Sequence, residues 1–227
     1  RAGQVLPDLL AILRRSDAAD VQLAVQLLEA WDQRATVDSP AACLYYPFLD
    51  RFWAGKFMGE ALQDDLFKLL PAAAPGLNRF DIGTFIRADS PWIAHEGLLI
   101  KTICAEMAEV VRRVKKGLGP DPEQWRWGNL HKVTFGHRLQ KHSPWNDMGV
   151  GPDEIGGSAT TLAMAMHMGK GPGFASNGSD DIPCRVYHGP AYRLVVDLAD
   201  TSQAQFVIAG GNGGRADSPM ASNHYAA

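Results

Sequence analysis

Three histidines lie near one another in the middle of this 227-residue chain, at positions 131, 137 and 142. Neutral imidazole is a common Zn²⁺ ligand, so a metal site is the first chemistry to consider. On a strand, His131 and His137 would share one face but lie about 20 Å apart at ~3.3 Å per residue, too far to bind one ion. No His-Glu-x-x-His motif accompanies them. We therefore expect structural or loop histidines and assign no metal ligand.

Nucleophilic chemistry is no better supported by the spacing of the residues. Ser158 follows two glycines, but the second glycine of a nucleophile elbow, two residues after the serine, is missing. Ser158, His131 and Asp197 are the residue types of a catalytic triad, yet the sequence gives no reason to place them together. The glycine-rich stretch 210–214 lacks the Gly-Lys-Ser/Thr ending of a phosphate loop. We assign no catalytic and no cofactor-binding residue in this chain.

The most distinctive stretch runs from residue 125 to residue 137 and separates two kinds of sequence. Trp125 and Trp127 each carry an N–H group that needs a hydrogen-bond partner when the ring is buried. Gly128 allows the backbone to turn where a side chain would clash. We interpret Trp125, Trp127, Gly128, His131 and His137 as candidates for a structural hinge. In that interpretation Trp127 is buried and His131 hydrogen-bonds a group across the junction.

The second half of this stretch has the alternation of a strand. Val133 and Phe135 share one face, and Lys132 and Thr134 share the other, which is typical of a half-buried strand. We predict a strand from Val133 to His137.

The residues before the hinge have the spacing of helices. Apolar residues recur at intervals of three and four, and Ser39-Pro40 is a strong N-cap signal followed by a first-turn proline. Asp17 or Asp20 is expected to cap one helix, and Gly117 to end another in the left-handed conformation. Helices are predicted over residues 6–13, from about 21 to 31, after 39, over 60–70 and 77–87, and from about 94 to 116.

The residues after the hinge alternate between short strands and glycine-rich loops. A loop is expected over 142–157, and residues 159–168 are ambiguous between helix and strand. Strands are predicted over 185–188, 192–199 and 205–209. The last two flank a short turn at 200–203 and therefore form a β-hairpin.

Composition narrows the partners and the compartment. Hydrophobic residues make up 46%, charged residues 21%, and the net charge is −3, so neither nucleic acid nor a membrane is expected as a partner. No apolar run approaches the ~20 residues of a membrane span. Three cysteines form no metal-binding spacing, and Cys43 and Cys104 are expected to be small buried hydrophobes. The chain starts at Arg1 without a signal-like segment, so we expect a processed chain or a fragment.

Two separated motifs carry a family resemblance. Trp-x-Trp-Gly-x-x-His at 125–131 and Gly-Pro-x-Tyr-Arg-x-Val-Val-Asp-Leu at 189–198 resemble the C-terminal part of the penicillin amidase family, which belongs to the N-terminal nucleophile (Ntn) hydrolases. The resemblance runs from about residue 6 to residue 225. It implies an α+β fold in which a mainly helical half, residues 1–124, packs on antiparallel β strands and loops, residues 125–227. Together they would form the C-terminal portion of one domain, part of an αββα sandwich.

The resemblance also implies the chemistry of a complete enzyme. Its members hydrolyse linear amides through an acyl-enzyme on a serine at the N-terminus of the large subunit, whose own α-amino group is the base. That serine, the oxyanion-hole asparagine and the ligands of any calcium ion would lie upstream of this chain. The implied partners are the small subunit, the rest of the large subunit and a small-molecule amide, in the bacterial periplasm or outside the cell. An N-acyl homoserine lactone acylase and a non-catalytic interaction module remain alternatives.

Overall fold

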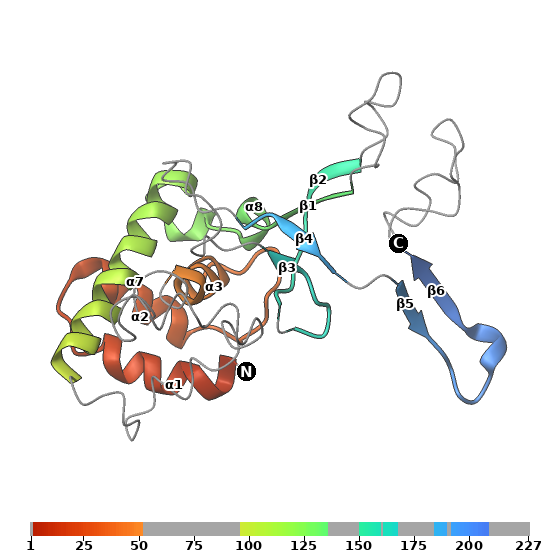
Figure 1. Ribbon diagram of the computed structural model, residues 1–227, viewed down its shortest axis with the longest axis horizontal. Coiled ribbons are helices and arrows are strands. Elements are labelled where there is room, and N and C mark those ends of the chain that lie inside the picture. The colour runs from red at the N-terminus through yellow and green to blue at the C-terminus, as the bar shows by residue number, and fades with distance from the viewer. Residues whose placement is uncertain are drawn as a thin grey trace, which may run out of the picture.

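A computed structural model describes residues 2–51, 96–135, 150–159, 161–167, 184–189 and 192–208. Helices gather on one side of the molecule, a small sheet lies beside them, and a separate hairpin lies beyond the sheet (Figure 1). This is an α+β arrangement, as predicted. The helices predicted over 60–70 and 77–87, the glycine-rich stretch 210–214, and His137 and His142 fall outside the described residues.

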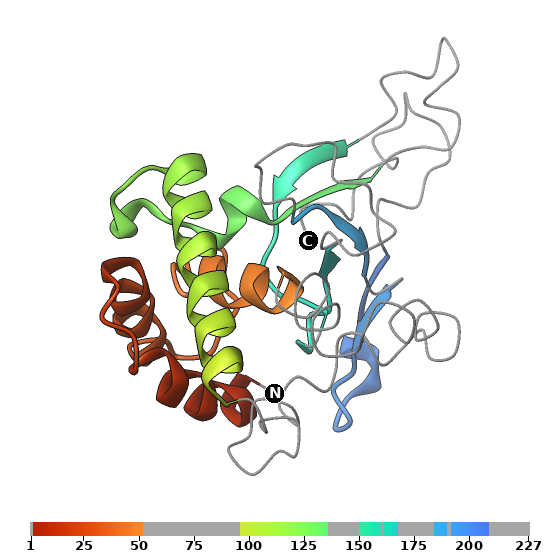
Figure 2. The same ribbon diagram turned by 60° about the vertical axis from the view of Figure 1, so that its left-hand side comes forward.

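The helical part is organised around one long helix. Its buried residues Ile103, Met107, Val110, Val111 and Val114 repeat at three and four positions, which produces a continuous apolar face. That face packs against the three N-terminal helices (Figure 2). The helices are α1 (Ala2–Leu13), α2 (Ala19–Glu29), α3 (Ala42–Arg51) and α7 (Glu96–Leu118). Within the described ranges, no helix is both long and apolar enough to span a bilayer.

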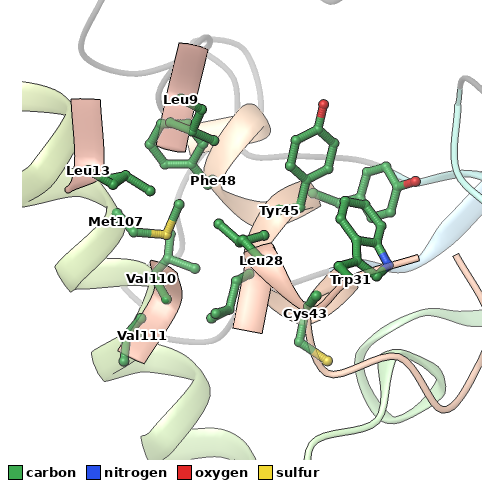
Figure 3. Close-up of a cluster of buried hydrophobic side chains, with 14 of the residues drawn as sticks. Leu9, Leu13, Leu28, Trp31, Cys43, Tyr45, Phe48, Met107, Val110 and Val111 are labelled. Atoms are coloured by element: carbon green, nitrogen blue, oxygen red, sulfur yellow. The ribbon is translucent and has the colours of Figure 1, made fainter. Parts of the chain in front are cut away.

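The core of this helical part is contributed by all four helices (Figure 3). Leu9 and Leu13 of α1 meet Leu28 of α2, Phe48 of α3 and Met107 of α7, and each of these side chains is fully buried. The same cluster continues through Trp125 and Trp127 toward the sheet. The helices and the junction that follows them therefore share one core.

The helix starts agree only in part with the sequence signals. The Ser39 hydroxyl accepts a hydrogen bond from the Ala42 N–H at 3.2 Å, which is the predicted capping bond. Helix α3 begins at Ala42, however, so Pro40 lies in the turn before the helix and not at its first position. The expectation that Asp17 or Asp20 caps α2 is wrong. Ala18 occupies the N-cap without a side-chain bond, and Asp20 lies inside the first turn, where its charge still favours the helix dipole.

The end of α7 lies two residues beyond its predicted position. Lys115 and Lys116 occupy the last turn, as the dipole argument requires. Gly117 is still helical, and Gly119, with φ of +97°, adopts the left-handed conformation. The prediction that Gly117 ends this helix in the left-handed conformation is therefore wrong, because Gly119 has that role.

The sheet beside the helices has four strands in the order β2-β1-β4-β3. The outer pairs β1–β2 and β3–β4 are antiparallel, whereas β1 and β4 pair in parallel at Val133 and Val186. The strands are β1 (Lys132–Phe135), β2 (Val150–Glu154), β3 (Met166–His167) and β4 (Val186–His188).

Strand β2 corrects the prediction of a loop over 142–157. Its sequence, Val-Gly-Pro-Asp-Glu, contains three residue types that are strongly depleted in strands, Gly, Pro and Asp. It lies at the edge of the sheet, where proline is tolerated because one side of the strand has no partner that needs a backbone N–H. The alternation between buried and exposed residues expected for β1 is also absent: all four of its residues are half-buried.

The predicted hairpin is present as β5 (Tyr192–Val195) and β6 (Gln205–Ile208), paired antiparallel. Its first strand ends at Val195, earlier than the predicted residue 199. Beyond it, Asp197 accepts a hydrogen bond from the Ala199 N–H, and Asp200 caps the 3-10 turn Thr201–Gln203. These side-chain bonds compete with the ladder and shorten the strand.

Candidate functional site

The junction between helices and sheet places both tryptophans of the hinge segment in full burial. The Trp125 indole N–H donates to the Gly119 carbonyl at 2.8 Å, and that of Trp127 donates to the Gly157 carbonyl at 3.0 Å. Each ring therefore has the polar partner that its burial requires. The Trp127 bond joins the short helix α8 (Trp127–Leu130) to the segment after β2.

Gly128 lies within α8, directly under an acidic side chain. A Cβ atom at this position would lie 2.8 Å from Glu154 Oε2 and 2.9 Å from Glu154 Cβ. Its backbone N–H donates to the Val37 carbonyl at 2.9 Å. Close approach of a neighbouring chain segment, and not a left-handed turn, explains the glycine. The interpretation of the segment as a hinge stays a prediction.

His131 follows α8 and is completely buried. Its Nδ1 lies 2.7 Å from the Ile155 carbonyl oxygen, and its Nε2 lies 3.1 Å from the Ala165 carbonyl oxygen. The ring stacks on the Trp127 indole, with ring centroids 4.5 Å apart and 16° between planes. The histidine thus bonds two segments across the junction, as the local pattern predicts.

Buried polar groups surround this ring. His167 meets His131 edge-on, with centroids 5.1 Å apart, and Tyr46 contacts both His167 and Trp127. The Tyr46 side chain hydrogen-bonds that of Ser158, which is also buried. Burial raises the pKa of Tyr46, and the bond to Ser158 opposes that rise. Tyr46 is therefore a neutral phenol near neutral pH.

The candidate triad of Ser158, His131 and Asp197 is not assembled. Ser158 and His131 are both buried at the junction, whereas Asp197 is exposed in the hairpin loop. Each nitrogen of His131 faces a backbone carbonyl, which occupies the position that a hydroxyl would need in order to give up its proton.

Arg126 forms two salt bridges at the exposed side of the junction. The Arg126 guanidinium lies 2.8 Å from Asp38 and 2.9 Å from Glu154. It thereby links the loop before α3 to the end of β2. The hydrogen bond to Asp38, with the charge of Glu154, raises the pKa of Arg126. This exposed group has a structural role and no reactive atom.

The cysteine thiols are buried, and the described residues form no metal-binding cluster. Burial raises the pKa of Cys43 to about 12 and also raises that of Cys104. Both side chains are buried, as predicted, and all three cysteines are free thiols. Among the residues that the structure describes, no three His, Cys, Asp or Glu side chains are placed to hold a metal ion.

Several residues of the junction have no clear sequence signal. His167 lies in the stretch that is ambiguous between helix and strand, and the sequence around Ser158 raises only the question of a nucleophile. Gly157 adopts a φ of +87°, which its place in a double glycine could have indicated. Tyr46 belongs to an aromatic-rich helix, where nothing local distinguishes it from its neighbours.

Comparisons with known proteins agree with the sequence motifs. The chain matches the family model described as penicillin amidase over residues 1–227. No match is found among curated proteins.

Proposed function

Because this chain belongs to the penicillin amidase family, we propose that it is the C-terminal part of the large subunit of an Ntn amidohydrolase. The family implies hydrolysis of amide bonds. The enzyme would hydrolyse a linear N-acyl amine through an acyl-enzyme on an N-terminal serine. Residues upstream would provide that serine, the oxyanion hole and any calcium ligands. This chain would provide the structural support behind them.

The environment of His131 carries the assignment of a supporting role. In a serine hydrolase with a histidine base, one imidazole nitrogen must face the nucleophile. Here both nitrogens face carbonyl oxygens, at 2.7 and 3.1 Å. The most buried histidine of the described residues, His131, thus has a structural role. A mechanism that uses an α-amino base needs no histidine.

In the proposed enzyme, the role of this chain would be to hold the catalytic groups in a fixed position. An α-amino group has an ordinary pKa of about 7.7–8.0, so it can accept the serine proton near neutral pH. The serine oxygen would attack the amide carbon, the amine would leave with a proton, and water would hydrolyse the resulting ester. Correct placement of these groups depends on a well-packed frame.

The hairpin β5–β6 supports the proposal that other parts of a precursor pack here. Leu194 and Val195 lie on opposite faces of β5, yet they are 54% and 69% exposed. Phe206 on β6 is 52% exposed. An apolar hairpin of this kind suits a position between two layers. We propose that the remainder of the large subunit and the small subunit cover it.

The test uses the full-length protein and this 227-residue chain in parallel. Both are offered a panel of chromogenic acyl-anilides, penicillins, cephalosporins and N-acyl homoserine lactones. We expect the full-length protein to hydrolyse at least one, with an acyl group trapped on a new N-terminal serine by mass spectrometry. The 227-residue chain should be inactive.

Two outcomes would overturn the proposal. Hydrolysis by the 227-residue chain at the rate of the full-length protein would place the nucleophile within it. Absence of both turnover and acyl adduct in the full-length protein would favour a non-catalytic module. The variant His131→Ala of the full-length protein is the control for the supporting role. Its kcat should be unchanged once folded, whereas a thousandfold fall without a lower melting temperature would make His131 catalytic.

A further inference from the structure

We infer that His131 is held as an imidazolium ion in the folded protein, so that pH controls how firmly the backbone at Ile155 and at Ala165 is attached to the end of helix α8. The ring lies between these two parts of the junction. Its Nδ1 is 2.7 Å from the Ile155 carbonyl oxygen and its Nε2 is 3.1 Å from the Ala165 carbonyl oxygen. The inference concerns the stability of the junction and does not depend on the proposed function.

The two carbonyl partners determine the protonation state. A backbone carbonyl oxygen can only accept a hydrogen bond, and neutral imidazole has a single N–H. In the neutral ring, one nitrogen lone pair would therefore point at an oxygen. The cation has two N–H groups and satisfies both carbonyls. The 2.7 Å distance is also in the range of charge-assisted bonds.

The stacking partner favours the same state. The His131 ring lies on the face of the Trp127 indole, nearly parallel to it at 16°. The π-face of an indole carries negative potential and attracts a cation, more strongly where water is excluded. Complete burial opposes the charge because it removes hydration. Two charge-assisted bonds and a cation–π contact together offset that loss.

Three titratable side chains of the described residues lie at the junction beside His131. His167 is 5.1 Å from His131 between ring centroids, and two cationic rings at this distance would repel. Tyr46, which contacts His167, is a phenol without charge. The Glu154 carboxylate, against Gly128, is paired with Arg126.

The direction of the pH effect follows from these contacts. A histidine in the unfolded chain has a pKa of about 6.5. Bonds that favour the cation raise the folded value above it. The stabilisation by His131 is then complete below about pH 6.5 and is lost as pH rises through the folded pKa. A histidine buried as the neutral ring would behave oppositely and lose stability on acidification.

The experiment compares melting temperatures of the full-length protein, its His131→Gln variant and its His188→Gln variant from about pH 5.5 to about pH 9, across the histidine titration. His188, on β4, is exposed and serves as the matched control. We expect the gap in melting temperature between wild type and His131→Gln to narrow as pH rises, and to narrow by more than the gap for His188→Gln changes. A His131→Gln gap that is constant or widens with pH overturns the inference.

A second measurement applies even if His131→Gln does not fold. In wild-type protein with ¹⁵N-labelled histidine, the His131 ring is identified by its proximity to the Trp127 indole protons. Near neutral pH, we expect both of its nitrogens to carry protons that exchange slowly with water. One unprotonated ring nitrogen at that pH would show a neutral ring and overturn the inference.

Discussion

The rings of Trp127 and His131 stack with their centroids 4.5 Å apart, one at the start of a single helical turn and the other just after its end. Each ring bonds a different part of the segment that follows β2. Trp127 reaches the Gly157 carbonyl, and His131 reaches those of Ile155 and Ala165. This pair joins the helical half to the segment that follows β2.

Removal of the Trp127 ring should therefore destabilise both halves at once. We expect Trp127→Ala to lower the free energy of unfolding by about 3–5 kcal/mol, as for other buried aromatic residues. Trp127→Phe keeps an aromatic surface for His131 but loses the bond to Gly157, and should cost less. Urea unfolding monitored by circular dichroism measures both. Equal costs for the two variants would show that stacking contributes nothing.

Gly157 and Gly117 should respond oppositely to the same substitution. Gly157 has a φ of +87°, and a Cβ atom there would collide with the Ala163 carbonyl oxygen, so Gly157→Ala should be strongly destabilising. Gly117 is helical, and a Cβ atom added to it would have no neighbouring atom within 4 Å. Gly117→Ala should stabilise by roughly 0.5–1 kcal/mol. Thermal unfolding of the two variants tests this contrast, which fails if both shift the midpoint in one direction.

The features that could be predicted from the sequence are those set by local chemistry. The repeat of apolar residues in α7, the Ser39 cap and the turn at 200–203 each depend on neighbours in the chain. The need of Trp125 and Trp127 for N–H partners was also predictable, because it follows from the side chain alone.

The features that could not be predicted depend on distant contacts. Strand β2 exists because β1 offers it a paired edge, although Gly151 and Pro152 disfavour a strand. The partners of His131 are carbonyls 24 and 34 residues away, which no local pattern identifies. His167 joins the junction only through the folding of β3.

The cysteines provide a direct test of the core. All three side chains are buried, and burial raises the pKa of Cys43 to about 12. Since the thiolate is the reactive species, folded protein at about pH 8 should react slowly with a chromogenic disulfide reagent. Unfolded protein should release three equivalents of the reagent's thiol per chain, one for each cysteine. Fast reaction of any of the three thiols in the native state would contradict their placement.

Acid should weaken one ion pair on α7. The hydrogen bond from Arg112, aided by Arg113, lowers the pKa of Glu109 to about 2. A lowered folded pKa means that the contribution is complete above the unfolded value, about 4.3, and is lost as pH falls toward about 2. Because the pair lies near the surface, Glu109→Gln should cost only about 0.3–0.5 kcal/mol at about pH 7. The cost should vanish in unfolding experiments near pH 2, and a cost that persists there would exclude this pair as its source.

The hairpin should make the 227-residue chain self-associate. In the described residues β5 and β6 pair only with each other, and Leu194, Val195 and Phe206 are exposed on them. A two-stranded sheet is marginally stable alone and offers two open edges. We expect dimers or larger species in sedimentation velocity experiments, and binding of a hydrophobic dye. Leu194→Lys should reduce both self-association and dye binding in this chain. Gln203→Ala, at the exposed polar tip, is the matched control and should do neither. A clean monomer with little dye binding would show that this surface needs no covering partner.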